Sequence, residues 1–264
     1  MASLAALVAA AALLPGFAPV GSGPAGGLVL TGRFPGTVRP GYVYLPPSFS
    51  TARRYPVVYL LHGMPGAPSE YLDGTRLLQV ADRAPRPFVA VLPAAGPSVH
   101  YDGEWAGTWE SDLVERIVPW IDRRLPTDAT PAGRVIAGLS AGGYGAVDIG
   151  LRHPGVFGTI ESWGGYFTPL RDGPLERAGS AELAAHDPTL LVRTKRAALV
   201  RARTRFFVST GPPHSRWAPP AATIRYAREL REAGLRCVLR VYSSRAGEWS
   251  RQLADGLRWA LQRA

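Results

Sequence analysis

Short, continuous apolar runs alternate with amphipathic helical patterns along most of this 264-residue chain. Runs such as PVVYLLH (Pro56–His62) and RVIAGL (Arg134–Leu139) are typical of strands that are covered on both faces. About eight strands are predicted: Leu28–Thr31, Tyr42–Leu45, Pro56–His62, Phe88–Leu92, Arg134–Leu139, Gly158–Ser162, Phe206–Ser209 and Cys237–Tyr242. Helices are predicted at Trp109–Arg124, Ala141–Leu151, Ala222–Ala233 and Glu248–Leu261. Strands that alternate with helices pair in parallel through right-handed crossovers, so one doubly wound α/β domain with helices on both faces is expected.

Composition narrows the class of protein. A core of this size needs no disulfide or metal to hold it together. Cys237 is the only cysteine, which excludes an internal disulfide framework and a multi-cysteine zinc site. The composition also excludes a disordered acidic chain, a collagen-like chain and a polytopic membrane protein. Neither a GxxxxGK[ST] phosphate loop nor an HExxH motif occurs, and we predict no metal and no cofactor.

Basic residues outnumber acidic ones by 30 to 20, which gives a formal net charge of +10. The segment Arg193–Arg205 holds six basic residues and no acidic one. At helical spacing it would form a cationic face able to meet an anionic envelope lipid or glycan, although a solvated arginine-rich face is the alternative. Because no recognition motif accompanies the charge, nucleic acid is not an expected partner.

An apolar stretch, Leu4–Leu14, opens the chain. It is too short to cross a bilayer, which needs about 20 residues, but it fits the apolar region of a secretory signal. The absence of Lys and Arg before it leaves open a disordered extension or a misassigned start. We interpret residues 1–27 as a signal-like or disordered leader and 28–264 as one domain, in which 168–205 could form a cap. A secreted or envelope-associated protein without a transmembrane span in its mature form is expected.

The strongest local motif is GLSAG, Gly138 to Gly142, which follows a predicted strand and opens a predicted helix. A G-x-S-x-G sequence in that context is typical of a nucleophile elbow, a strained turn that exposes its serine above the sheet. Glycines two residues before and after are needed because the two backbones pack closely. Ser140 is therefore the predicted nucleophile, placed where a helix N-terminus favours an oxyanion.

A second turn of small residues, HGMPG, follows the strand Pro56–His62. In hydrolases of this architecture such a loop donates one backbone N–H to the oxyanion hole, and the residue after the nucleophile donates the other. The predicted donors are the N–H groups of Met64 and Ala141. His62 is expected either to bond this loop or to border the pocket.

These motifs resemble the esterase D and mycolyltransferase branch of the α/β-hydrolases. The matching segments are LLHG (Leu60–Gly63), LPAAGPSVHYDGEW (Leu92–Trp105), TWESDL (Thr108–Leu113), GLSAGGYGA (Gly138–Ala146) and RHPGVFG (Arg152–Gly158). The resemblance implies an α/β-hydrolase fold and a carboxylesterase, thioesterase or acyltransferase activity. It also implies a serine, an acid and a histidine in that chain order, with His100 and Trp109 in segments that could line the pocket. Trp163, which follows a predicted strand, is expected either to line an apolar acyl site or to pack in the core.

The chain departs from the family pattern at the histidine and the acid. The family places its histidine in the loop before the last helix, where this chain has Gly247. A serine hydroxyl needs a base within hydrogen-bond reach. The predicted base is His214, because it lies in the loop that normally carries the acid, close to where a base could reach Ser140. His100, in the segment that lines the pocket in the family, is the second candidate. Residues 209–214, where related esterases keep an Asp, hold no carboxylate. Mycolyltransferases instead place a Glu on the following helix, and this resemblance makes Glu229 the predicted acid.

Two functions follow from these residues. The first is a serine carboxylic-ester hydrolase or acyltransferase acting on a small-molecule or lipid acyl ester. The second is a non-catalytic member of the fold that binds a glycan, lipid or protein, because loss of the base from a working triad costs on the order of a millionfold in kcat.

Overall fold

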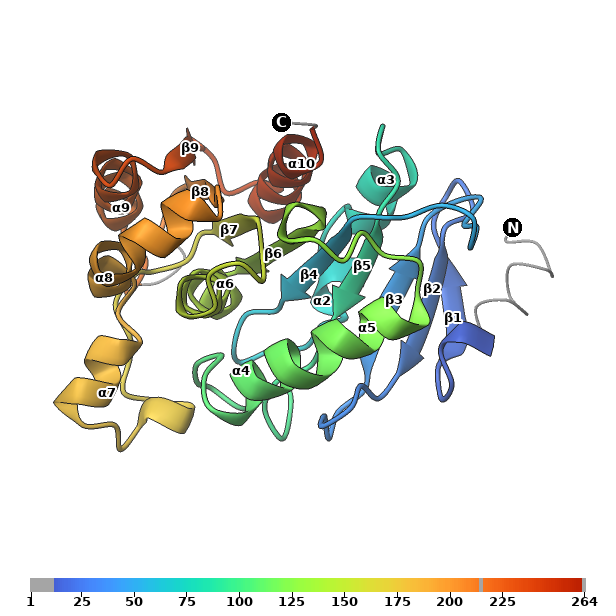
Figure 1. The fold of residues 1–264 in the computed structure, drawn as a ribbon, viewed down its shortest axis with the longest axis horizontal. Coiled ribbons are helices and arrows are strands. Elements are labelled where there is room, and N and C mark those ends of the chain that lie inside the picture. Colours follow the sequence, from blue (N-terminus) through green and yellow to red (C-terminus); the bar gives the residue numbers. More distant parts are fainter. Residues whose placement is uncertain (1–11, 214–215, 263–264) are drawn as a thin grey trace.

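The structure, a computed structural model, describes residues 12–213 and 216–262. In this part of the chain nine strands form one sheet in the order β1-β2-β3-β5-β4-β6-β7-β8-β9 (Figure 1). The strands are β1 (Ala18–Ser22), β2 (Leu28–Gly32), β3 (Gly41–Leu45), β4 (Val57–Leu61), β5 (Val89–Leu92), β6 (Arg134–Leu139), β7 (Thr159–Trp163), β8 (Arg205–Thr210) and β9 (Arg236–Val241). Pairing is parallel from β5 to β9 and antiparallel among β1, β2, β3 and β5. The predicted mostly parallel α/β sheet is confirmed.

Helices cover both faces of this sheet, as expected (Figure 1). The helices are α2 (Glu70–Asp73), α3 (Leu77–Asp82), α4 (Thr108–Ser111), α5 (Val118–Arg124), α6 (Ala141–Arg152), α7 (Ser180–Ala185), α8 (Pro188–Arg201), α9 (Pro220–Glu232) and α10 (Glu248–Ala260). A π-helical segment, Asp112–Ile117, joins α4 to α5, so the predicted helix Trp109–Arg124 is continuous. One apolar core lies under α5, α6, α8 and α9, and a second lies under α2, α3 and α10.

Helix α6 is the central helix of the larger core. It is buried along nearly its whole length because β6 and β7 lie on one side and α8 on the other. Its glycines permit these close approaches: a Cβ at Gly145 would lie 2.4 Å from the Trp105 side chain, and one at Gly150 would lie 2.4 Å from Ile160. This packing fixes the start of α6, and therefore Ser140, above the middle of the sheet.

The domain begins earlier than expected. Within the predicted leader 1–27, the side chains of Leu14 and Phe17 are buried in the core, and Ala18–Ser22 pairs with β2 as an edge strand. Residues 12–27 are therefore packed on the domain, which corrects their assignment to a leader. Residues 1–11 lie outside the described residues, and their role as a signal stays a prediction. No helix in the described part of the chain is long and apolar enough to cross a membrane.

Residues 168–205 make up most of the connection from β7 to β8, and Arg205 is the first residue of β8. They include α7, which stands out at the lower left of Figure 1, and α8, which packs against α6 and α9. The second half of this segment is therefore an ordinary crossover of the doubly wound sheet. The first half packs on the loop before α4, where Leu175 and Ala178 form a small apolar cluster with Ala106.

Candidate active site

Ser140 lies between the end of β6 and the first residue of α6, with φ 54° and ψ −119°. A positive φ is strained for a residue with a side chain and is typical of a serine at a nucleophile elbow. The backbone around it is held on both sides: the Ser140 N–H donates to the Trp163 carbonyl (3.1 Å), and the Gly143 N–H donates to the Ser140 carbonyl (2.8 Å). The side chain is partly exposed above the sheet.

The elbow depends on glycine at two positions. A Cβ at Gly138 would lie 2.1 Å from the Gly142 carbonyl oxygen, and one at Gly142 would lie 1.9 Å from the Leu61 carbonyl oxygen. No Cβ fits at such distances, and the obstructing atoms are backbone. The close packing inferred from the motif is therefore present, and it joins the start of α6 directly to the end of β4.

The loop after β4 lies beside Ser140. A Cβ at Gly63 would be in ordinary contact, 3.5 Å, with the Ser140 Cβ. The next amide along the chain is that of Met64, one of the two predicted oxyanion donors. The other, on Ala141, is the first amide of α6, so it has no acceptor within its helix. Arg39 donates to the carbonyl of Gly66 in this loop (3.2 Å) and to that of Ala95 in the loop after β5 (2.7 Å), so it holds the two loops together.

His62 holds this loop from inside. Its Nδ1 lies 2.7 Å from the Gly63 carbonyl oxygen, and its Nε2 accepts the Ala95 N–H at 3.1 Å. The ring is 1% exposed and packs edge-on against Trp105. Burial lowers the pKa of His62 to about 4, so the ring is neutral at physiological pH and donates from Nδ1. Both ring nitrogens are engaged, which favours a positioning role over a place in the pocket wall.

Two other histidines are paired away from Ser140. His153, at the far end of α6, contacts Glu110 (2.7 Å), and His186 contacts Asp148 (2.6 Å). His100 is exposed in the loop after β5. His214, the predicted base, lies outside the described residues, so its role stays a prediction.

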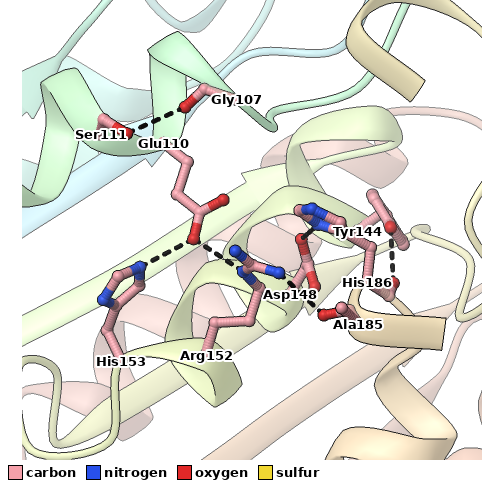
Figure 2. Close-up of polar contacts among 9 residues, drawn as sticks. All are labelled: Gly107, Glu110, Ser111, Tyr144, Asp148, Arg152, His153, Ala185 and His186. Atoms are coloured by element: carbon pink, nitrogen blue, oxygen red, sulfur yellow. Dashed lines mark hydrogen bonds and ion pairs between the residues drawn. The ribbon is translucent and has the colours of Figure 1, made fainter. Parts of the chain in front are cut away.

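A buried polar network joins α4, α6 and the end of α7 (Figure 2). Ligand atoms of Glu110, Asp148 and His186 lie within 4.8 Å of one another, a spacing compatible with a metal ion. However, the Arg152 Nε donates to Glu110 at 2.8 Å, and Figure 2 shows its guanidinium between the two carboxylates. A guanidinium already supplies the positive charge there, so we interpret the network as structural. Burial raises the pKa of Asp148 to about 6, against the hydrogen bond with His186.

A second buried polar chain lies where the loops after β8 and β9 meet. The carboxylate of Glu248, the first residue of α10, is 1% exposed and accepts a hydrogen bond from Gln252 Nε2 at 2.6 Å. The Gln252 Oε1 in turn accepts from the Ser209 hydroxyl at 2.6 Å. Gly247, where the family keeps its histidine, has φ 62°, a conformation that favours glycine.

The remaining predicted residues are spread over different parts of the fold. Trp109 is half-buried and packs edge-on against Tyr101 beside the Glu110 network. Trp163 is fully buried, with its Nε1 donating to Glu161 at 3.0 Å, so its side chain belongs to the core and only its carbonyl supports Ser140. Glu229 lies in the second half of α9, close to Tyr226.

The predicted cationic face is largely present. Arg193, Lys195, Arg196, Arg201 and Arg203 are exposed on α8 and just after it. Arg205 is not part of this face, because its guanidinium donates to Thr159 and Ala260 and stacks over Trp259. An anionic partner for the face stays a prediction.

Comparison with known families agrees with this geometry. The model of the esterase family, described as "Putative esterase", matches residues 34–260. The chain belongs to this family. A Mycobacterium tuberculosis protein named Esterase Rv1288 is 31% identical over 137 residues, which cover 49% of this chain and 30% of the relative. The chain thus spans less than a third of that relative's length.

Solved structures confirm the α/β-hydrolase fold. A ferulic acid esterase has a TM-score of 0.72 and 22% identity, covering 89% of this chain and 96% of its own. An S-formylglutathione hydrolase from Agrobacterium tumefaciens has a TM-score of 0.69 and 18% identity, covering 92% of this chain and 97% of its own. The fold class and the esterase branch expected from the motifs are therefore confirmed.

Proposed function

We propose that this esterase-family chain hydrolyses carboxylic esters through Ser140. The observation that carries the proposal is the elbow itself: Ser140 at φ 54°, enforced by Gly138 and Gly142, with the Gly63 loop in contact beside it. A strained backbone at a partly exposed serine is expected where the strain serves the site. Membership of an esterase family favours this activity over the alternative of a non-catalytic binding protein.

The mechanism follows from the placement of Ser140. Its Oγ attacks the ester carbonyl carbon while the base takes the hydroxyl proton, and the carbonyl oxygen becomes an oxyanion. The N–H groups of Met64 and Ala141 are the proposed donors to that oxyanion, helped by the positive end of α6. The protonated base then gives its proton to the departing alcohol, and water hydrolyses the acyl-enzyme by the same steps.

The proposed base is His214. The pairing of His62, His153 and His186 with other groups supports this choice. His100 is the second candidate. The proposed substrate is a small-molecule or lipid acyl ester, and the same acyl-enzyme would serve acyl transfer if an alcohol replaced water. Secretion or attachment to the cell envelope also stays a proposal.

Covalent labelling tests the nucleophile. Wild-type protein should react with a fluorophosphonate probe within minutes at neutral pH and hydrolyse p-nitrophenyl acetate. Ser140→Ala should lose labelling and reduce kcat by roughly a millionfold, whereas Ser98→Ala, an exposed serine, should behave as wild type. If wild-type protein stayed unlabelled for hours, the proposal of a serine esterase would be excluded. If His214→Ala kept undiminished esterase activity, His214 would be excluded as the base, and His100→Ala would be tested next.

A further inference from the structure

Glu248, the first residue of α10, is a buried carboxylate with no role in the mechanism proposed above. Its side chain lies directly against Gly211, just past the end of β8: a Cβ at Gly211 would lie 2.3 Å from the Glu248 Oε1 and 2.8 Å from the Oε2. The carboxylate therefore occupies the space that a side chain at residue 211 would fill. It reaches there from α10, which follows the loop after β9.

The orientation of this carboxylate is fixed by its neighbours. The Ser209 hydroxyl donates to the Gln252 Oε1, which directs the Gln252 Nε2 towards the Glu248 Oε1. Burying a carboxylate is unfavourable by several kcal/mol unless its oxygens are well satisfied. Glu248 is 1% exposed and is held by a chain of hydrogen-bonded side chains, so a functional role is expected for it.

The loops after β8 and β9 are tied together at this point. The Tyr242 N–H donates to the Thr210 carbonyl at 2.8 Å, and the Arg245 guanidinium donates to the Pro213 carbonyl. Pro213 is bonded directly to His214 in the sequence. Both loops follow adjacent parallel strands and open at the edge of the sheet that carries Ser140, because β8 pairs with β7 and β7 with β6.

We infer that Glu248 is the acid that orients the catalytic base, an inference that rests on the proposed function. Relative to the family that the chain resembles, the acid and the base have then exchanged loops. The base lies in the loop after β8, and the carboxylate follows the loop after β9. Neighbouring parallel strands lie about 4.8 Å apart, so the two loops can exchange roles without moving the serine.

In this arrangement Glu248 is the hydrogen-bond acceptor for the base. It accepts an N–H of the imidazole, which leaves the other ring nitrogen to take the Ser140 proton, and it stabilises the imidazolium that forms. Glu229 is less suited to this task. Arg231, two residues further along α9, donates to the carbonyl of Cys237, which stands near the start of β9. That is the opposite edge of the sheet from Ser140.

The test compares Glu248→Gln with Glu229→Gln, two isosteric changes of a glutamate. Glu248→Gln should lower kcat for p-nitrophenyl acetate and the rate of fluorophosphonate labelling by about 10³–10⁴-fold, with KM within a few fold. It should also move the apparent pKa of the acylation rate downwards, since the imidazolium loses its charged partner. A merely structural role would not shift that pH profile. Glu229→Gln should stay within about threefold of wild type.

Further variants distinguish a failure of the Glu248 inference from a failure of the proposed function. Glu248→Asp, which keeps the charge, should fold and recover part of the activity, so it carries the test if Glu248→Gln fails to fold. Glu248→Gln or Glu248→Asp with wild-type rates and pH profile would overturn the inference, as would a large loss in Glu229→Gln instead. Those results would leave the proposed function intact because Ser140→Ala would still abolish labelling. Unlabelled wild-type protein would end both proposals.

Discussion

The two sides of the candidate site are built in different ways. On the β4–β6 side, backbone meets backbone: the start of α6 touches the carbonyl of Leu61, and only glycine fits at residue 142. On the β8–β9 side, a chain of side chains from Ser209 through Gln252 to Glu248 fills the space. Backbone contacts permit almost no substitution, whereas a chain of side chains can be rebuilt with the same chemistry supplied from another loop. This difference predicts which residues tolerate change.

The largest effect is expected from Gly142→Ala. Its new Cβ would lie 1.9 Å from the Leu61 carbonyl oxygen, so the start of α6 must move away from β4. We expect a loss of about 4 kcal/mol or more in the free energy of unfolding, together with loss of labelling at Ser140. Urea denaturation monitored by circular dichroism measures the first and fluorophosphonate labelling the second.

Gly247→Ala is the matched change on the other side. A Cβ there would meet no atom of the described residues within 4 Å, so the expected penalty is that of the positive φ of 62°, roughly 1–2 kcal/mol. If Gly247→Ala destabilised the protein as much as Gly142→Ala, the contrast between the two sides would be wrong.

The next effect is a loss of folding stability at low pH that is due to His62. Because the pKa of His62 is lowered to about 4, its contribution to stability is fully present above pH 6.5. It is lost as the pH falls from 6.5 to 4, where the unfolded chain takes up the proton first. Over this range the contribution declines by about 3 kcal/mol.

His62→Phe, which keeps a ring against Trp105, isolates this contribution. We expect the variant to be less stable at pH 7, because two hydrogen bonds in the oxyanion loop are lost, and the difference from wild type to shrink towards pH 4. Denaturant midpoints from pH 4 to 8 measure it. His100→Ala, at an exposed position, should leave stability near the wild-type value. A difference between His62→Phe and wild type that stays constant across this range would contradict the assignment.

A smaller loss of stability is expected at Gly211. Here a Cβ would meet the end of the Glu248 side chain, 2.3 Å away, and that side chain can move where a backbone carbonyl cannot. We therefore expect Gly211→Ala to lower the free energy of unfolding by only about 1–2 kcal/mol, while kcat falls by at least tenfold. Paired measurements of unfolding and ester hydrolysis check this. If Gly211→Ala were stable and kept the wild-type kcat, a role of Glu248 in the reaction would be contradicted.

The same contrast explains what the sequence could predict. The elbow was predictable because its chemistry is written in adjacent residues: a buried strand, a G-x-S-x-G turn and a helix. The parallel strands were predictable for a similar reason, since runs such as VIAGL, residues 135–139, have no polar residue on either face. Backbone constraints of this kind act locally and leave a signature in a short window of sequence.

Glu248 was not identified in that way. In the sequence, a carboxylate at the start of a helix indicates only a favourable interaction with the helix dipole. The fold is needed to show that Glu248 lies against Gly211, 37 positions earlier in the chain. The strand β1 was missed because APVGS contains Gly and Pro and is exposed along its whole length. For Trp163 the sequence leaves the pocket and the core open, and only the fold shows that its ring lies in the core, between Tyr71 and Gly256.

The smallest effect is expected from Gly63→Ala, within the oxyanion loop itself. Its Cβ would meet the Leu139 carbonyl and the Ser140 Cβ at 3.5 Å, which is ordinary contact, and Gly63 has no positive φ. Stability should therefore stay within about 0.5–1 kcal/mol of wild type, with a small gain favoured because alanine restricts the unfolded chain. Labelling of Ser140 should change by less than about threefold. If Gly63→Ala instead abolished labelling while the fold persisted, the loop would have to move during catalysis. The β4–β6 side would then be less rigid than its glycine contacts indicate.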